Sequence, residues 1–173
     1  MVVETIASEF RKTRQLADRA IAQLTDDELH ARLDPEANSV AMLMAHMAGN
    51  MRSRWTDFLT TDGEKPWRTR DAEFEPPPLA RGDLVASWEA GWQVLFDTLA
   101  GLTDDDLTRP VMIRGEAQTA LAAMLRQVSH YAGHAHQIVL LAKHLKGAEW
   151  TVLSIPRGGS AAYTAASHAA GRP

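Results

Sequence analysis

A stretch of nine residues, SHYAGHAHQ at 129–137, holds three of the seven histidines in this 173-residue chain. On an α-helix each residue advances about 100°, so His130 and His134 lie about 40° apart on one face, one turn from each other. Two imidazoles in that arrangement can bind one metal ion. His136 is rotated by about 200° from His134, so we expect it on the surface or at an interface.

An earlier stretch resembles this one. HMAGN at 46–50 matches HYAGH at 130–134 at three of five positions, and both fall in predicted helices. If an approximate twofold axis relates the two helices, His46 faces His130 and His134 across the interior. The shared Ala-Gly pair would let another helix approach closely. The alternative is that both stretches reflect helix packing alone and that the protein binds no metal.

Three histidines leave at least one coordination position open to water or substrate, which is typical of catalytic sites. Imidazole suits Zn²⁺, Ni²⁺, Fe²⁺ and Cu²⁺ alike, and our expectation is zinc or nickel. A bound divalent ion lowers the pKa of a coordinated water or thiol and so supplies a nucleophile at neutral pH. The chain has no cysteine, which excludes thiolate ligands and a cysteine nucleophile. No glutamate stands at the spacing of an HExxH helix, so we assign no catalytic residue.

The first half of the chain is expected to form two long helices. Apolar residues recur every three or four positions over 1–24, which predicts an amphipathic helix. Thr25 followed by Glu28 has the form of a capping box and predicts a short helical turn. Ser39 can cap a second helix, which we expect to end near residues 62–63.

The second half repeats this plan. Asp83 is expected to cap a third helix that Gly101 ends, and Thr119 to open a fourth that continues to Lys146. The stretch RPVMIRGEAQT between them favours an extended hairpin or strand. The motif LTDDEL after the first helix returns as LTDDDL after the third.

These elements predict an all-α fold, an up-down four-helix bundle made of two αα-hairpins. A long loop over 63–82 joins helices two and three, and Trp67 and Phe74 are expected to pack it onto the bundle. We place the bundle domain at 1–163 and an irregular, small-residue C-terminal tail at 164–173.

Composition excludes several classes of protein. The formal net charge is −4 and no block of Lys and Arg occurs, so nucleic-acid binding is not expected. The first residues mix acidic and basic side chains and lack the apolar core of a signal peptide. No apolar run reaches the length of a membrane span. We therefore expect a cytoplasmic protein with no membrane partner.

Three further motifs give a family resemblance. HMAGNMRSRWTDFLTTDGEKPW, IRGE and LSIPRG, together with the HxxxH pair, resemble a bacterial branch of unknown function within the DinB/YfiT-like superfamily of metal-dependent enzymes. The resemblance covers residues 1–163. It implies the four-helix fold and a metal site at His46, His130 and His134. Bundles of this kind often pair through helix faces, so we also expect a homodimer.

Three polar residues are candidates to support the site. Asn50 and Arg54 continue the helix face of the first histidine, Asn50 as a residue supporting the ligands and Arg54 as a contact for an anionic substrate. The alternative for Arg54 is a helix-end ion pair with Asp57 or Asp62. Arg157 could reach back over the mouth of the bundle, or it could anchor the tail or a dimer interface.

Two classes of function follow. The resemblance implies an enzyme that uses a small-molecule substrate and a low-molecular-weight thiol such as bacillithiol or mycothiol, as in S-transferases; hydrolysis is the nearest variant. The other class is a non-enzymatic, dimeric metal-binding helical protein that acts in a stress response. A structural site would be closed by a fourth ligand, Asn50 or a carboxylate, whereas an enzyme needs an open position in a polar pocket.

Overall fold

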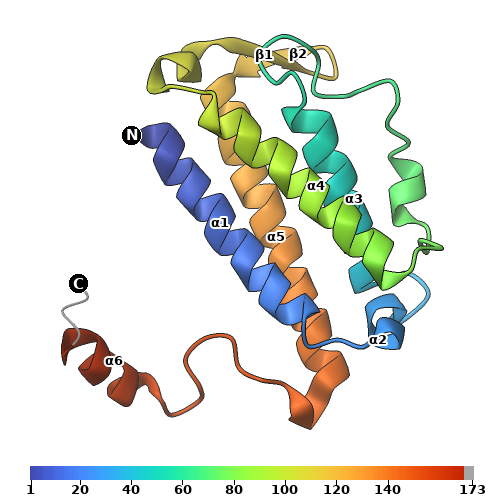
Figure 1. The fold of residues 1–173 in the computed structure, drawn as a ribbon, viewed down its shortest axis with the longest axis vertical. Helices are drawn as coiled ribbons and strands as arrows, with labels where there is room; N and C mark the ends of the chain where they lie inside the picture. The colour runs from blue at the N-terminus through green and yellow to red at the C-terminus, as the bar shows by residue number, and fades with distance from the viewer. Residues whose placement is uncertain (170–173) are drawn as a thin grey trace.

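Four long helices pack together in the computed structural model, which describes residues 1–169 (Figure 1). They are α1 (Val2–Ile21), α3 (Val40–Trp55), α4 (Arg81–Ala100) and α5 (Ala120–Lys146). The shorter elements are α2 (Asp26–His30), the 3₁₀ helices Asp71–Phe74, Asp104–Thr108 and Gly147–Glu149, the strands β1 (Pro110–Ile113) and β2 (Glu116–Thr119), and α6 (Ser160–Ala169). The chain is therefore mainly helical, with one small antiparallel hairpin that an all-α description omits.

The helix starts follow local capping. The hydroxyls of Ser39 and Thr119 accept hydrogen bonds from backbone N–H groups three residues on, at the starts of α3 and α5, as predicted. The capping box of Thr25 is also present and opens α2. The third helix is present and Gly101 ends it, as predicted, but the predicted cap is wrong, because α4 begins at Arg81 and Asp83 lies within its first turn.

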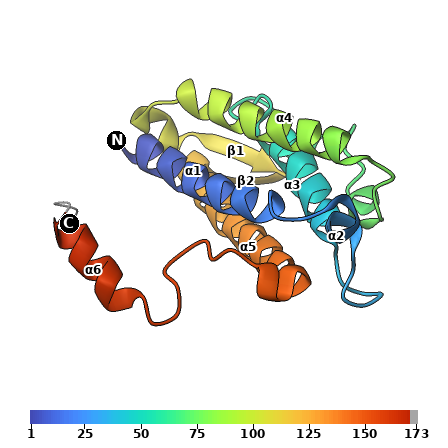
Figure 2. The ribbon, with the colours of Figure 1, turned by 60° about the horizontal axis from the view of Figure 1, so that its bottom comes forward.

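The helices do not simply alternate in direction. α3 and α4 run the same way: Gly91 lies against Ala48, and further along both helices the hydroxyl of Thr98 donates a hydrogen bond of 2.8 Å to the carbonyl of Trp55. α1 and α5 run the opposite way (Figures 1 and 2). The predicted up-down order is therefore wrong at this step. The second helix ends earlier than expected, and residues 56–80 return along the bundle before α4 begins (Figure 1).

The internal repeat is visible in the structure. Both LTDD motifs form a short helical turn that opens with a capping box, one at Thr25 after α1 and one at Thr103 after α4. Each turn buries its last leucine, Leu29 and Leu107. The chain thus makes the same helix–turn–helix plan twice, which places α3 and α5 in equivalent positions (Figure 2).

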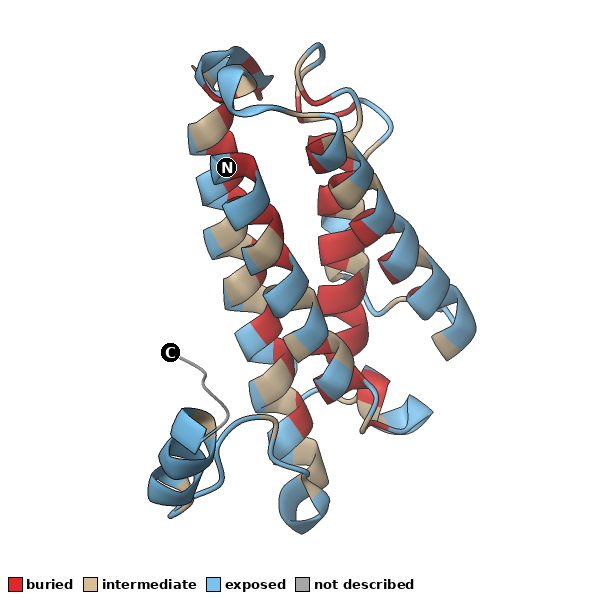
Figure 3. Cartoon of the chain, turned by 60° about the vertical axis from the view of Figure 1, so that its left-hand side comes forward, coloured by how far each residue is buried: buried red, intermediate tan, exposed pale blue. Residues whose placement is uncertain are grey.

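The core lies between the four long helices (Figure 3). Its largest fully buried side chains include Phe10, Trp55, Trp88, Trp92 and Tyr131. Rings of Phe10 and Trp55 meet edge to face with centroids 5.6 Å apart. Within residues 1–169, no helix combines the length and the apolar character that crossing a bilayer requires.

The C-terminal segment is only partly irregular. Gly147 ends α5 with a φ of 53°, as expected from its position after the last helical residue. Residues 150–159 then lead to α6, which buries none of its side chains and stands apart from the bundle (Figure 3). The helix contradicts the prediction of an irregular tail up to residue 169; residues 170–173 of that prediction lie outside the described residues. The domain boundary at 163 stays a prediction.

The close approach of α3 and α4 depends on the missing side chain of Gly91. A methyl group there would lie 3.0 Å from Cα of Ala48 and 3.0 Å from Cε of Met51. We expect Gly91→Ala to lower the free energy of unfolding by about 1–3 kcal/mol through overpacking, despite the better helix propensity of alanine. Gly82→Ala, in the same helix with no atom within 4 Å of the added carbon, is the control. Urea unfolding that finds the two variants equally stable would contradict this.

Candidate metal centre

Three imidazole rings from two helices meet in the bundle interior. His46 on α3 is 3% exposed, and His130 and His134 on α5 are half-buried. The Nε2 atom of His130 lies 3.3 Å from Nε2 of His46 and 3.0 Å from Nε2 of His134. The ligand atoms of all three lie within 4.8 Å of one another. The structure therefore brings together the three residues that the HxxxH spacing and the internal repeat indicate.

The opposite nitrogen of each ring is held by an oxygen atom. Nδ1 of His46 lies 2.9 Å from a carboxylate oxygen of Glu73, Nδ1 of His134 lies 2.7 Å from the amide oxygen of Gln137, and Nδ1 of His130 lies 3.3 Å from that of Gln127. An oxygen acceptor at Nδ1 selects the tautomer that carries its proton there. The three Nε2 lone pairs are then left pointing at a common centre.

Hydrogen bonds between the rings do not explain this arrangement. A neutral imidazole nitrogen carries either one proton or one lone pair, so Nε2 of His130 can make only one good hydrogen bond to its two neighbours. A tetrahedral metal ion with Zn–N bonds of about 2.0–2.1 Å instead separates its ligand nitrogens by about 3.3 Å. The observed separations of 3.0 and 3.3 Å fit that geometry closely. A divalent cation between the lone pairs would also remove their mutual repulsion.

The surroundings of His130 and His134 favour the neutral form of both rings. Burial, followed by the neighbouring His134 and His46, lowers the pKa of His130 to about 3. Burial also lowers the pKa of His134, although its hydrogen bond with Gln137 acts in the opposite direction. Metal ligation requires neutral imidazole, so both histidines are in the ligating form at neutral pH.

Residues 56–80, called the return segment below, contain the 3₁₀ helix Asp71–Phe74, which supports His46. Glu73 accepts two hydrogen bonds from Arg68, of 2.8 and 2.7 Å, in addition to the bond from His46. Burial alone would raise the pKa of the Glu73 carboxyl, but these hydrogen bonds lower it overall, so the group is ionised. The ring of Phe74 packs on that of His46 with centroids 4.6 Å apart. Trp67, in contrast, is 52% exposed and lies under the guanidinium of Arg52.

Only the first of the two Ala-Gly pairs lies at a close helix contact, where Ala48 packs against Gly91 of α4, and its glycine has another role. A methyl group on Gly49 would lie 2.8 Å from Cδ of Glu73 and would overlap its carboxylate, so this glycine makes room for the group that holds His46. A methyl group on Gly133 would meet no atom within 4 Å. The shared glycines therefore have different roles, and only Gly49 is required by the site.

A pocket of about 380 Å³ opens next to the histidines. Its walls come from α3, the return segment, the hairpin turn and α5. Besides the three histidines it is lined by Asn50, Arg54, Arg68, Arg70, Phe74, Arg114, Arg126 and Gln127. The pocket is large enough for a small molecule, and its lining is strongly polar.

Two of the predicted supporting residues lie at this pocket. Asn50 is buried, and its amide oxygen accepts a 2.9 Å hydrogen bond from the hydroxyl of Tyr131. Arg54 is also buried and donates to the carbonyl of Gly63 and, at 3.3 Å, to Glu64. It forms neither of the helix-end ion pairs that the sequence left open. Arg157 is exposed in the segment before α6 and does not line the pocket.

His136 takes the outward position that its rotation predicts. It is exposed, and its ring nitrogen lies 2.7 Å from the carbonyl oxygen of Ala132 one turn earlier. It shares the helix, but not the face, of His130 and His134. This makes it a natural control for experiments on the other two.

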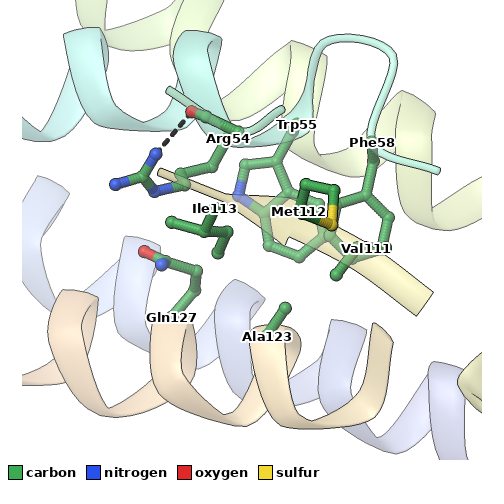
Figure 4. A pocket seen from close by; sticks show the side chains of 9 residues that line it. Arg54, Trp55, Phe58, Val111, Met112, Ile113, Ala123 and Gln127 are labelled. Carbon is green, nitrogen blue, oxygen red and sulfur yellow. Dashed lines mark hydrogen bonds between the residues drawn. The ribbon is translucent and has the colours of Figure 1, made fainter. Parts of the chain in front are cut away.

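A second, smaller cavity lies on the other side of Arg54 (Figure 4). In this view Arg54, Trp55 and Phe58 lie above it and Ala123 of α5 lies below, with the buried side chains of Val111 and Ile113 on β1 between them. Its volume of about 10 Å³ has room for at most one water molecule. The hairpin therefore packs over one end of the bundle. It also holds the segment that contacts Arg54, because the N–H of Gly63 donates to the carbonyl of Met112 at 2.8 Å.

Comparison with protein families identifies the family of this chain. The model of a family described as a protein of unknown function, DUF1572, matches residues 1–159. The chain belongs to the DUF1572 family. No curated protein matches the sequence. The family match covers the bundle, the three histidines and the return segment, so the site lies inside the region that defines a DUF1572 protein.

Sequence reasoning missed the groups that orient the histidines in this DUF1572 chain. Gln127 and Gln137 stand three residues before His130 and three after His134, a spacing that places each on the same helix face as its histidine. This spacing could have identified both glutamines from the sequence. Nothing in the sequence marks Glu73, because it lies among several acidic residues in a loop and reaches His46 only through the path of the return segment.

Gly49 gives a specific test of the support for His46. We expect Gly49→Ala to displace the Glu73 carboxylate and to lower metal affinity about tenfold or more, the usual effect of losing a group that orients a ligand. Gly133→Ala, the equivalent change on α5, should leave the affinity unchanged because its added carbon has no neighbour. Competition with a chromogenic chelator measures both. Equal losses in the two variants would mean that Glu73 does not support the site.

Proposed function

We propose that the protein is a metal-dependent enzyme in which His46, His130 and His134 hold one divalent ion, zinc or nickel, next to a substrate pocket. The observation that carries the proposal is the pairing of roles at each ring: Nδ1 bonded to an oxygen and Nε2 directed at a shared centre. This is how metal-binding histidines are oriented in proteins.

The openness of the site favours an enzyme over a structural metal site. Among the described residues, no fourth histidine, aspartate or glutamate joins the group of three. Asn50, the candidate fourth ligand, uses its amide oxygen for Tyr131. The Glu73 carboxylate is occupied by Arg68 and His46. A coordination position facing the pocket would therefore be available to water or substrate.

A divalent ion at this position supplies Lewis acidity, which lowers the pKa of a water or thiol bound to it. The protein residues do the rest. Glu73, Gln127 and Gln137 fix the ring orientations, and the arginine-rich wall receives the substrate. This division of roles suits both reactions that the sequence suggests, transfer to a low-molecular-weight thiol and hydrolysis.

Several finer expectations belong to this proposal. Membership of the DinB/YfiT-like superfamily is supported by the four-helix packing and by the position of the histidines on α3 and α5. A homodimeric, cytoplasmic protein stays a prediction from the sequence. The second candidate, a non-enzymatic metal-binding protein of the stress response, requires the pocket to have no substrate, and the open polar pocket is what favours the enzyme.

Metal content tests the proposal directly. Protein purified without a polyhistidine tag should contain close to one divalent ion per chain, as measured by inductively coupled plasma mass spectrometry. His130→Ala removes the ligand that lies between the other two, so we expect metal to fall to background and the melting temperature to lose its sensitivity to chelator. His136→Ala should keep the metal of the wild type, because this side chain points away from the site. Equal, near-zero metal in wild type and His130→Ala would eliminate a metal-dependent function.

The choice between thiol transfer and hydrolysis has its own test. With cobalt in the site, a thiol that binds the ion gives a sulfur-to-cobalt charge-transfer band in the near-ultraviolet. If a thiol is the cosubstrate, bacillithiol or mycothiol should produce this band in the wild type and not in His130→Ala. Saturating thiol without any spectral change would count against transfer and in favour of hydrolysis.

A further inference from the structure

Five arginines line the pocket beside the histidines. Arg54 comes from α3, Arg68 and Arg70 from the return segment, Arg114 from the hairpin turn and Arg126 from α5. No aspartate or glutamate is among the lining residues. The chain as a whole carries a net charge of −4, so this concentration of positive charge is local to the pocket.

The carboxylates behind the pocket neutralise only part of this charge. Glu64 lies 3.3 Å from Arg54 and 2.9 Å from Arg114, and 3.8 Å from Arg68. Glu73 pairs with Arg68 and also holds His46. Asp71 lies 3.9 Å from Arg70. Three carboxylates thus face five guanidinium groups. The surplus of positive charge favours an anion in the pocket.

Guanidinium groups remain free to bind such an anion. Arg126 is exposed at the pocket wall, and its guanidinium forms no hydrogen bond or ion pair with any of residues 1–169. At the inner end, the Arg68 side chain is 2% exposed, and its Nη1 is a buried nitrogen without a hydrogen-bond partner, 3.8 Å from a carboxylate oxygen of Glu64. A buried charged donor without an acceptor is unfavourable, and an anionic ligand would satisfy it. Guanidinium donors without a hydrogen-bond partner thus lie at both the exposed and the buried end of the pocket.

The hairpin turn is built to present one of these groups. Arg114 and Gly115 form the two-residue turn of the IRGE motif, with φ values of 57° and 76°. Glycine or asparagine usually occupies the first of these positions, since a larger side chain is strained there. Asp62 holds the turn by accepting the backbone N–H groups of Arg114 and Gly115 at 2.8 and 2.7 Å. An arginine fixed in this conformation at a pocket edge indicates a binding role.

We propose that the pocket binds a small molecule with at least two oxyanion groups, either two carboxylates or a carboxylate and a phosphate ester. Arg54 and Arg68 receive one group at the buried end near the histidines. Arg70, Arg114 and Arg126 receive the other at the exposed end. Guanidinium suits both chemistries because its fork of donors matches carboxylate and phosphate oxygens alike. As a substrate assignment this rests on the proposed function, whereas the binding itself does not require the metal.

Calorimetry with two probes tests the proposal. Succinate and orthophosphate are titrated into the protein as purified, at constant ionic strength and with chloride as the reference anion. We expect at least one probe to bind, and its preference identifies the carboxylate or the phosphate source. Arg126→Gln, which breaks no side-chain hydrogen bond or ion pair among residues 1–169, should weaken that binding about tenfold, the effect of one lost charge-assisted hydrogen bond. Arg157→Gln, an exposed arginine outside the pocket, should bind as the wild type does.

The outcomes separate this proposal from the metal site. Binding that weakens about tenfold in Arg126→Gln but keeps its wild-type strength in His130→Ala supports the anion pocket even if no metal is found. Metal-containing protein that binds neither probe more tightly than chloride overturns the anion proposal and leaves the metal proposal standing. Equal affinities in Arg126→Gln, Arg157→Gln and wild type also overturn it, because binding would then be nonspecific.

Discussion

The hydrogen bond between Nδ1 of His46 and the carboxylate of Glu73 joins the two parts of the molecule on which the site depends. One part is the helix pair α3 and α5, which carries the three imidazoles. The other is the return segment, which supplies Glu73, Arg68 and Arg70. Without this bond the His46 ring would have no fixed tautomer, and Glu73 would no longer join this part of the return segment to α3. The missing side chain of Gly49 leaves the space that this carboxylate occupies.

The order of the helices explains why such a segment is present. Because α3 and α4 run in the same direction, the chain must return along the length of the bundle between them. A simple up-down bundle would join these helices with a short turn and would leave the face of α3 beside the histidines open to solvent. The return segment covers that face. It converts two histidine-bearing helices into one wall of a pocket and adds the remaining walls itself, together with the hairpin.

The sequence predicted what is periodic and missed what depends on the path of a loop. Helical spacing fixes the direction of a side chain, so the convergence of His130 and His134 and the outward position of His136 could be predicted, and the repeat added His46. Capping residues fixed the starts of α3 and α5. The direction of α4, the role of Glu73 and the gathering of arginines from four segments could not be predicted, because no periodicity relates residues 56–80 to the helices they cover. The two Ala-Gly pairs are a further example, because Gly49 lies against the Glu73 carboxylate whereas Gly133 has no neighbouring atom within 4 Å of an added methyl group.

The charges of the site impose a condition on its ligands. A divalent cation held by the three histidines would be repelled by the five arginines, and Glu64 and Glu73 would offset only part of that repulsion. An anionic substrate would offset the rest, so metal and anion would each stabilise the binding of the other. By thermodynamic linkage this coupling is reciprocal: the factor by which the anion raises metal affinity equals the factor by which the metal raises anion affinity. A pocket that were only a structural metal site would gain nothing from its arginines, whereas an enzyme that activates a nucleophile beside an anionic substrate uses both charges together.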